Sequence, residues 1–209
     1  NRVEIFLNRT QPELIVNAAA YTAVDRAETE SEAAFRINAE LPGCLARWTA
    51  RNDALLLHYS TDYVFSGEAR EPYREDARTG PLNLYGESKL AGERAITASG
   101  CRHLVLRTSW VYSGHGNNFV LTMLRLARER PSLSIVSDQT GCPTWARNLA
   151  RVSSSLLEQV GRQLGRVLDR SRQGVVHRAG RCRLPLEANS AGEVSLRIHV
   201  DQQHGLISQ

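Results

Sequence analysis

Tyr85 and Lys89 stand four residues apart, in the order Y-x-x-x-K, within a segment whose pattern predicts a helix. Positions four apart lie on one face of a helix, so the two side chains are expected to be neighbours. A free phenol, with a pKa near ~10, is a poor acid–base group at neutral pH. A neighbouring ammonium stabilises the phenolate, so we expect Lys89 to lower the pKa of Tyr85 and to bring it closer to useful proton transfer.

Lys89 is the only lysine in the chain, where every other basic side chain of the Lys and Arg type is an arginine. Arginine stays protonated and presents a broad planar fork, whereas an ammonium is a compact donor. The alternative is an incidental pair on a helix surface. The retention of one lysine, at this distance from a tyrosine, favours a functional pair.

A hydroxyl group that could work with this pair lies at the end of a predicted strand. Thr61 stands 24 residues before Tyr85, between Ser60 and Asp62. Its hydroxyl could bind a substrate carbonyl and share the negative charge that develops on that oxygen. Taken alone, Ser-Thr-Asp is a turn or a helix cap. Beside Tyr85 and Lys89, we interpret Thr61 as part of a catalytic site.

Apolar runs of strand length alternate with longer helical patterns, which is typical of parallel strands joined by crossover helices. The predicted strands are Leu14–Asn17, Ala54–Ser60, His103–Thr108 and Leu133–Val136. The predicted helices are Glu32–Arg51, Asn83–Ser99, Asn118–Arg130 and Thr144–Leu157. The fold class is therefore α/β, with a doubly wound, Rossmann-like parallel sheet. Such sheets bind ligands at the carboxyl ends of their strands, where small and polar residues follow three of the predicted strands.

A glycine-rich phosphate-binding loop is expected near the start of a dinucleotide fold. The first glycine here is Gly43, inside a predicted helix. We therefore expect the sheet to be incomplete at the N-terminus, without its first βαβ unit of roughly 30 or more residues. Residues 1–160 are predicted to form the NAD(P)-binding domain. Residues 161–209 are predicted to be a remnant of a substrate domain or a disordered basic tail.

Charge and composition exclude several classes of function. The chain carries a net charge of +4, but residues 1–150 hold equal numbers of basic and acidic side chains, and the basic excess lies in a tail without aromatic residues. A nucleic-acid binder usually combines a basic face with aromatic residues, so none is predicted. No apolar run is long enough to cross a membrane, and we expect a cytoplasmic protein. The four scattered cysteines, Cys44, Cys101, Cys142 and Cys182, favour buried or idle thiols over zinc or disulfides.

Five motifs together resemble the dTDP-4-dehydrorhamnose reductase family, within the extended short-chain dehydrogenases/reductases. They are N-A-A-A-Y-T-A-V-D-R-A-E at 17–28, S-T-D-Y-V-F at 60–65, P-L-N-L-Y-G-E-S-K-L-A-G-E at 81–93, R-T-S-W-V-Y at 107–112 and G-N-N-F at 116–119. The Y-x-x-x-K motif implies only the superfamily, whereas the first block and T-S-W are more diagnostic. The resemblance covers roughly residues 2–160 and ends after G-V-V-H at 174–177.

The resemblance implies an NADPH- or NADH-dependent reduction of the 4-keto group of dTDP-4-dehydro-6-deoxy-L-mannose, which gives dTDP-L-rhamnose. It implies a catalytic trio of Thr61, Tyr85 and Lys89. Residues that would border the cofactor are Ala19, Ala20 and Ser60, together with Tyr85 and Lys89. Residues that would face the sugar or its nucleotide are Thr22, Val24, Trp110 and Asn118. An indole that leaves a strand end would also offer a flat apolar wall for a sugar ring, although a core role is an equal alternative.

Related activities differ in their residues. Sugar-nucleotide dehydratases place an Asp-Glu pair after the threonine, whereas Tyr63 follows Asp62 here, so simple keto reduction fits better. A non-catalytic relative, such as the regulatory subunit of methionine adenosyltransferase, or another nucleotide-sugar reductase, remains the alternative. Some family members hold Mg²⁺ through glutamates at a homodimer contact. That site cannot be mapped onto residues 178–209, so no metal ligand is assigned and a homodimer is only implied.

Overall fold

The computed structural model describes residues 2–69, 71–134, 141–172 and 194–195, and the chain divides into two compact units. The first unit holds Asn1–Thr108 with Leu186–Gln209, and the second holds Ser109–Pro185. Helix α7 (Ala146–Arg172) runs through residue 160 without a break. The domain boundary that we expect at that residue stays a prediction.

A parallel sheet forms the centre of the first unit, with the strand order β1-β2-β3-β6. Its strands are β1 (Leu14–Asn17), β2 (Leu55–Thr61), β3 (Arg102–Thr108) and β6 (Val194–Ser195). The first three agree with predicted strands to within a residue, because each is a short apolar run. The strand predicted at Leu133–Val136 falls partly outside the described residues, and its described half is not strand.

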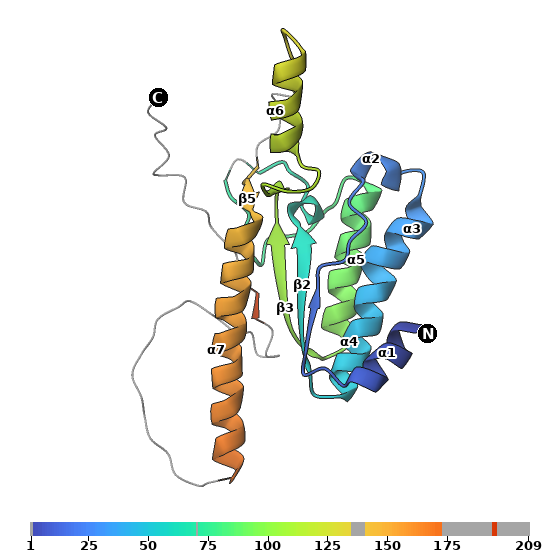
Figure 1. Ribbon diagram of the computed structural model, residues 1–209. Coiled ribbons are helices and arrows are strands. Elements are labelled where there is room, and N and C mark those ends of the chain that lie inside the picture. The colour runs from blue at the N-terminus through green and yellow to red at the C-terminus, as the bar shows by residue number, and fades with distance from the viewer. Residues whose placement is uncertain (1, 70, 135–140, 173–193, 196–209) are drawn as a thin grey trace. The chain divides into compact units, whose positions relative to one another are not determined.

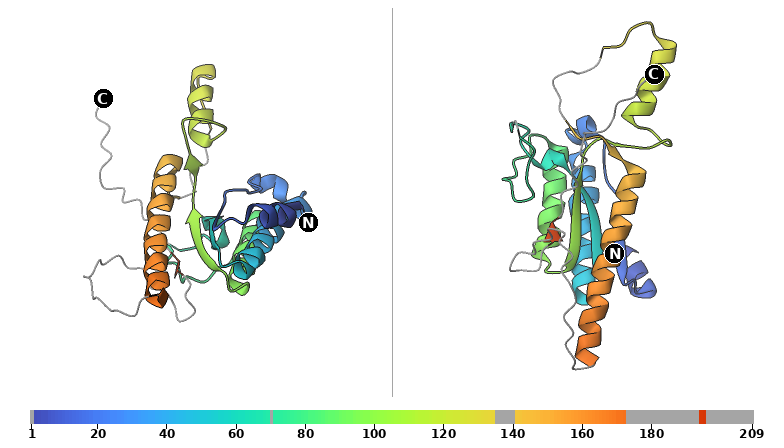
Figure 2. Two further views of the ribbon diagram at one scale, coloured as in Figure 1. Left: turned by 60° about the horizontal axis from the view of Figure 1, so that its bottom comes forward. Right: turned by 90° about the vertical axis from the view of Figure 1, so that its left-hand side faces the viewer.

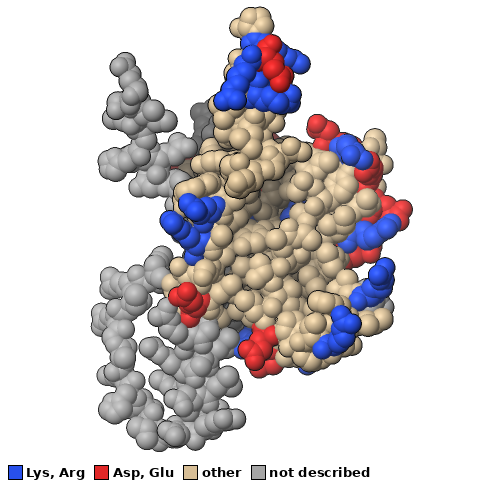
Figure 3. Space-filling model, in the orientation of Figure 1, with Lys and Arg blue, Asp and Glu red and all other residues tan. Residues whose placement is uncertain are grey.

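Helices line one face of this sheet. Figure 1 shows α4 (Leu41–Arg51) and α5 (Leu84–Ala98) running beside β2 and β3, and the views of Figure 2 agree. The described part of the unit also contains α1 (Arg2–Thr10), α2 (Val24–Ala27), α3 (Ser31–Phe35) and the short 3₁₀ turn η2 (Asp62–Val64). In Figure 3, acidic and basic side chains alternate over the region of α2 and α3, where Arg26 pairs with Glu30 and Arg36 pairs with Glu32.

An apolar core joins α1, α4 and α5 to the sheet. Leu7, Trp48, Leu56 and Ile96 are at most 5% exposed and belong to one cluster. The indole nitrogen of Trp48 donates to Asn8 Oδ1 at 2.7 Å, so the polar edge of this large ring is satisfied at the margin of the core. Burial of such side chains is the main favourable term in folding, at about 1.5–3 kcal/mol each.

The helix predicted at Glu32–Arg51 is interrupted by a π-helical turn, η1 (Arg36–Glu40). Pro42 explains the interruption, because it has no N–H to donate to the carbonyl of Asn38 four residues earlier. The backbone N–H of Leu41 instead reaches back to the carbonyl of Arg36. The carbonyl of Asn38 is thereby left facing α5, where a Cβ atom on Gly92 would lie only 2.1 Å from its oxygen. A glycine is therefore required at this helix crossing.

The second unit contains a two-stranded parallel sheet, β4 (Val111–Tyr112) with β5 (Thr144–Trp145), and the helices α6 (Phe119–Glu129) and α7. Helix α6 agrees with its prediction to within a residue at each end. Helix α7 begins two residues later than predicted, because Thr144 and Trp145 form β5, and it ends well beyond Leu157. Within the described part of the chain, no helix is both long enough and apolar enough to span a bilayer.

Three of the four cysteines are described, and none of these three forms a disulfide. Cys101 is buried, as expected, and Cys44 is partly exposed. Cys142 is exposed, so burial does not hold for it. Cys182 lies outside the described residues.

Candidate active site

The start of helix α5 is held in place by two side chains that accept its free backbone N–H groups. Asn83 caps the helix, with Oδ1 accepting from the N–H of Gly86 at 2.8 Å. Glu28 Oε1, from the segment after β1, accepts from the N–H of Leu84 at 2.9 Å. Such caps satisfy donors that the helix leaves unpaired. Tyr85, in the first turn, is thereby fixed relative to β1.

A close backbone approach brings the same turn against the end of β2. A Cβ atom on Gly86 would lie 2.3 Å from the carbonyl oxygen of Tyr63, so only glycine fits. The rings of Tyr63 and Tyr85 then meet edge to face, with centroids 5.5 Å apart. This contact places the Tyr85 phenol beside the residues that follow β2.

The structure brings Thr61 and Tyr85 together. Both are buried, and the Thr61 hydroxyl is close enough to the Tyr85 phenol to lower its pKa. Thr61 Oγ1 also accepts from the N–H of Tyr63 at 3.3 Å, which fixes the hydroxyl at the entry to η2. Two hydroxyl groups are therefore paired at the carboxyl end of a parallel strand, which is where sheets of this kind bind ligands.

Lys89 lies one turn further along α5 and is 1% exposed. Its Nζ donates to the carbonyl oxygen of Tyr59 at 2.7 Å and lies 3.4 Å from Nε2 of His58. Burial lowers the pKa of Lys89 to about 8, and the negative charge of Glu93 opposes that shift. The lone amine is therefore directed at strand β2 and holds its proton less firmly than an exposed lysine does.

The prediction that Lys89 lowers the pKa of Tyr85 is wrong for this structure. Burial raises the pKa of Tyr85 above its ordinary value, the hydrogen bond with Thr61 opposes that shift, and the charges of Asp62 and Tyr63 add to it. The amine does not contribute because it is directed at β2. A phenol with a raised pKa remains protonated at neutral pH, and this is the form that a proton donor needs.

Ser60, Ala19 and Ala20 lie at the ends of two neighbouring strands. Ser60 is 4% exposed, and among the residues that the structure describes its Oγ has no hydrogen-bond partner. A buried hydroxyl without a partner costs about 1–3 kcal/mol, so such a group often marks a binding site. Ala19 and Ala20 are exposed and follow β1, and the N–H of Ala19 donates to Asn17 Oδ1 at 3.2 Å.

The four predicted substrate residues divide between the two units. Thr22 is exposed in the first unit, and Val24 packs against the cluster that contains Tyr85. Trp110 and Asn118 belong to the second unit. Asn118 caps α6, because its Oδ1 accepts from the N–H of Leu121 at 3.1 Å. The amide group that was predicted to face the sugar therefore also has a structural role.

Trp110 adopts an unusual backbone conformation. Its φ angle is +45°, which is uncommon for a residue with a side chain, and such strain is often found at functional sites. One edge of the indole packs over Gly141, where a Cβ atom would lie 2.7 Å from the ring. The side chain is nevertheless 45% exposed.

A second group of side chains, which the sequence did not single out, holds the loop after η2. The Arg107 guanidinium forms two hydrogen bonds to the Glu93 carboxylate, at 3.1 and 2.7 Å, and a third to the carbonyl of Glu75 at 3.1 Å. It also lies over the ring of Phe65, 4.9 Å from the centroid. The loop is thereby tied to α5 one turn beyond Lys89. The sequence signal was the basic residue Arg107 inside an apolar strand.

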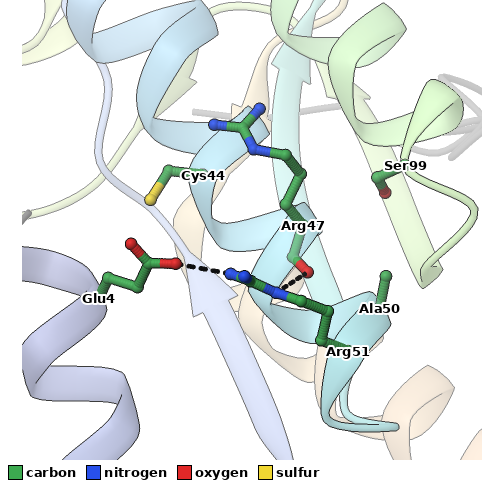
Figure 4. A pocket seen from close by; sticks show the side chains of 6 residues that line it. All are labelled: Glu4, Cys44, Arg47, Ala50, Arg51 and Ser99. Atoms are coloured by element: carbon green, nitrogen blue, oxygen red, sulfur yellow. Dashed lines mark hydrogen bonds and ion pairs between the residues drawn. The ribbon is translucent and has the colours of Figure 1, made fainter.

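A hollow of about 400 Å³ lies elsewhere in the first unit and shares no residue with this site (Figure 4). Its lining residues are Glu4, Cys44, Arg47, Ala50, Arg51 and Ser99. Arg51 donates to Glu4 at 2.6 Å and to the Arg47 carbonyl at 3.2 Å. Because this arginine is already satisfied by protein groups, the hollow offers little for chemistry. Within the described ranges, no group of three or more His, Cys, Asp or Glu side chains could hold a metal ion.

Comparison with known proteins connects this geometry to a family. Residues 1–194 match the RmlD substrate binding domain. The chain belongs to the dTDP-4-dehydrorhamnose reductase family. The reductase of Salmonella typhimurium is 51% identical over 144 residues, which are 69% of this chain and 48% of that protein. The reductase of Mycolicibacterium smegmatis is 42% identical over 187 residues, or 88% of this chain and 57% of that protein.

Solved structures of the family confirm the Rossmann-like fold. The reductase of Bacillus anthracis, in complex with NADP, aligns with a TM-score of 0.73 and 40% identity, over 75% of this chain and 56% of that one. The Clostridium acetobutylicum protein aligns with the same TM-score and 41% identity, over the same shares. The chain spans about half the length of the family members it matches.

The buried His58 makes the folding stability of this chain depend on pH in the acid range. Burial, with the nearby Lys89, lowers the pKa of His58 from 6.5 to about 3. Between these values the unfolded chain binds more protons than the folded one, so stability falls as the pH drops from about 6.5 towards about 3. The contribution is at most about 1.4 kcal/mol per pH unit. Urea unfolding across this range is expected to show a weaker pH dependence in His58→Phe than in the parent chain.

A second histidine provides the control for this measurement. His103, on β3, is partly exposed and bonds the carbonyl of Cys101. His103→Phe is expected to keep the acid dependence of the parent chain. Equal slopes for the parent chain and His58→Phe would contradict the assignment.

Proposed function

We propose that this chain carries the catalytic residues for the NAD(P)H-dependent reduction of dTDP-4-dehydro-6-deoxy-L-mannose to dTDP-L-rhamnose. The observation that carries the proposal is that the buried hydroxyl groups of Thr61 and Tyr85 lie together at the end of β2, with the chain's lone lysine one helical turn away. Two named relatives with this activity, at 51% and 42% identity, support the choice of reaction.

The chemistry follows from the two hydroxyl groups. Tyr85 stays protonated at neutral pH and gives its proton to the 4-oxygen of the sugar, which becomes a far stronger base than a phenolate as the carbonyl is reduced. The Thr61 hydroxyl holds the same oxygen and shares its developing charge. Burial of both groups strengthens these interactions because little water competes. The nicotinamide cofactor, when bound, supplies the hydride to the 4-carbon.

The residues at the strand ends fit a dinucleotide. Ser60 offers a buried hydroxyl that lacks a partner among the described residues, and a ribose or amide group would satisfy it. Ala19 and Ala20 are small and exposed after β1, so they allow close approach of a flat ring system. Lys89 would bind the nicotinamide ribose, and Tyr85 would border it. The NADP complex of the Bacillus anthracis relative supports this assignment.

Thr22, Val24, Trp110 and Asn118 complete the proposal on the substrate side. The exposed indole of Trp110, held by a strained backbone, offers a flat apolar wall suited to a sugar ring. Thr22 and Asn118 carry groups that can bond sugar hydroxyls or phosphate oxygens. Val24 contributes apolar contact beside the cluster that contains Tyr85. The proposal includes a cytoplasmic location. It also includes a homodimer, whose formation analytical ultracentrifugation would test.

The decisive experiment mixes the purified chain with NADPH and the keto sugar nucleotide. Loss of NADPH absorbance, together with dTDP-rhamnose identified by NMR, is the expected result. NADPH fluorescence measured without the sugar reports cofactor binding separately. Cofactor binding without turnover of this sugar, under conditions where a relative's enzyme is active, would contradict the proposed reaction and favour a binding role.

A further inference from the structure

The buried imidazole of His58 lies within the otherwise apolar strand β2 and contacts Lys89. His58 is 0% exposed, and each of its ring nitrogens lies within hydrogen-bonding distance of a polar side chain. Nδ1 lies 2.9 Å from Asn17 Nδ2 on β1, and Nε2 lies 3.4 Å from Lys89 Nζ on α5. Buried polar groups in a strand core need such partners. Asn17, His58 and Lys89 therefore form a continuous series of contacts from β1 through β2 to α5.

The first link determines where the imidazole carries its hydrogen. Asn17 Oδ1 accepts from the N–H of Ala19, so the amide nitrogen of Asn17 must face the ring. An amide nitrogen only donates, and Nδ1 of His58 must therefore accept. A neutral imidazole that accepts at Nδ1 carries its hydrogen on Nε2. His58 stays neutral in the folded chain at ordinary pH, since its pKa is lowered to about 3.

The second link brings this Nε2–H against Lys89. A lysine ammonium has three donors and no acceptor, so a protonated Nζ and Nε2–H would present donor to donor. An unprotonated amine can instead accept from Nε2–H while it continues to donate to the Tyr59 carbonyl at 2.7 Å. The geometry therefore makes the ammonium form of Lys89 less favourable than it is in an exposed lysine.

Other charged and titratable groups near Lys89 do not remove this preference. Glu93, one turn on along α5, favours a charged amine, but both its oxygens are bound by Arg107 from β3. Tyr85, one turn earlier, stays a neutral phenol because burial raises its pKa. The carboxylate of Asp62, which follows β2, accepts a hydrogen bond from the Thr61 hydroxyl at 3.2 Å.

We propose that His58 is a positioning residue for Lys89, whose neutral imidazole, held by Asn17 with its hydrogen on Nε2, directs the amine at β2 and disfavours a proton on Nζ. The contacts among these side chains can be tested without any enzymatic activity. Their role in catalysis rests on the proposed function. There, the Asn17–His58–Lys89 chain would set the pH at which the lysine beside the cofactor ribose changes charge.

The single lysine makes a direct test available. Lysine labelled with ¹³C at Cε gives one side-chain signal from the whole chain, and its shift against pH reports the titration of Lys89 alone. In the parent chain the midpoint is expected near pH 8, as burial lowers the pKa of Lys89 to about 8. In His58→Gln, whose amide oxygen can accept from the ammonium, we expect the midpoint to rise by roughly one pH unit or more. His103→Gln is the matched control and is expected to leave it unchanged.

A second substitution tests the tautomer itself. In Asn17→Asp, the carboxylate would accept from Nδ1–H, move the ring hydrogen off Nε2 and let Nε2 accept from the Lys89 ammonium. The midpoint is expected to rise, and to rise less when the same change is made in His58→Gln, which has no tautomer to switch. Equal rises in both backgrounds would show that the aspartate acts by charge alone and would overturn the proposal.

The unaltered chain provides a measurement that needs no variant to fold. Nitrogen-15 spectra of labelled histidine are expected to show His58 neutral at pH 7 with its hydrogen on Nε2. A hydrogen on Nδ1, or a Lys89 midpoint near the ordinary value of ~10.4, would overturn the proposal. These readouts involve no catalysis. If they come out as expected while the reductase assay fails, the proposed function falls and the role of His58 remains.

Discussion

Replacing Tyr85 with phenylalanine is expected to lower the rate of keto-sugar reduction by about 10²–10⁴-fold, the usual contribution of a positioned general acid. The change removes the phenol oxygen and keeps the ring that packs edge to face on Tyr63. The fold and the cofactor affinity should therefore be nearly unchanged, so the loss falls on the turnover number. Steady-state kinetics, with NADPH titration and circular dichroism of the variant, measure these effects separately.

Tyr63→Phe is the matched control for this result. It removes a phenol hydroxyl from the neighbouring ring, whose edge contact with Tyr85 it preserves. A rate close to that of the parent chain is expected. An unchanged rate in Tyr85→Phe, or an equal loss in both variants, would remove Tyr85 from the role of proton donor.

Gly92→Ala is expected to destabilise the chain by about 3 kcal/mol, at the upper end of the usual range for overpacking. The new Cβ atom would lie 2.1 Å from the carbonyl oxygen of Asn38, which is backbone and cannot rotate away. Alanine would otherwise stabilise a helix interior by about 1 kcal/mol relative to glycine, so the sign of the change is decisive. Thermal unfolding should show a midpoint lowered by roughly 6–12 °C.

Gly114→Ala serves as the control for a glycine without close neighbours. No atom lies within 4 Å of a Cβ placed at Gly114. Its substitution is expected to change the midpoint little. A stabilised Gly92→Ala variant would show that α5 and the π-helical turn are further apart than the structure places them.

The sequence predicted the strands well because each is bounded by clear changes of composition. Leu14–Asn17 is a short apolar run between polar segments, and its predicted bounds are those of β1. Leu55–Leu57 is fully apolar and buried on both faces, as parallel strands are. The helix that begins after Asn83 was predicted from its periodicity and start signals, and the cap was found there.

The π-helical turn was missed because the contacts that support it are distant in sequence. Pro42 indicates only that one helical hydrogen bond is absent. Asn38 is 0% exposed, and its side chain bonds the backbone of Tyr21 and the hydroxyl of Ser88. These tertiary contacts, which no local pattern reveals, support the wide turn. Such turns are frequent near functional sites, and this one adjoins the helix of Tyr85.

The roles of the candidate site residues stay a prediction, whereas the expected electrostatics of Tyr85 are contradicted by the structure. Spacing placed Tyr85 and Lys89 on one helix, and the strand end placed Thr61 beside them. Spacing could not show that the amine is directed at the Tyr59 carbonyl, nor that burial dominates the pKa of the phenol. The first depends on how α5 packs against β2 and the second on the burial of the Tyr85 side chain, and neither is visible in a local sequence pattern.

Because Lys89 is buried, its chemical modification can be used to measure opening of the folded chain. An acylating reagent that modifies lysine side chains finds one target in the sequence, and in the folded chain that target is 1% exposed. Acylation at this position therefore requires α5 to separate from the sheet, at least transiently. The mass added at Lys89 by a brief exposure to the reagent would count the molecules in which α5 has separated from the sheet.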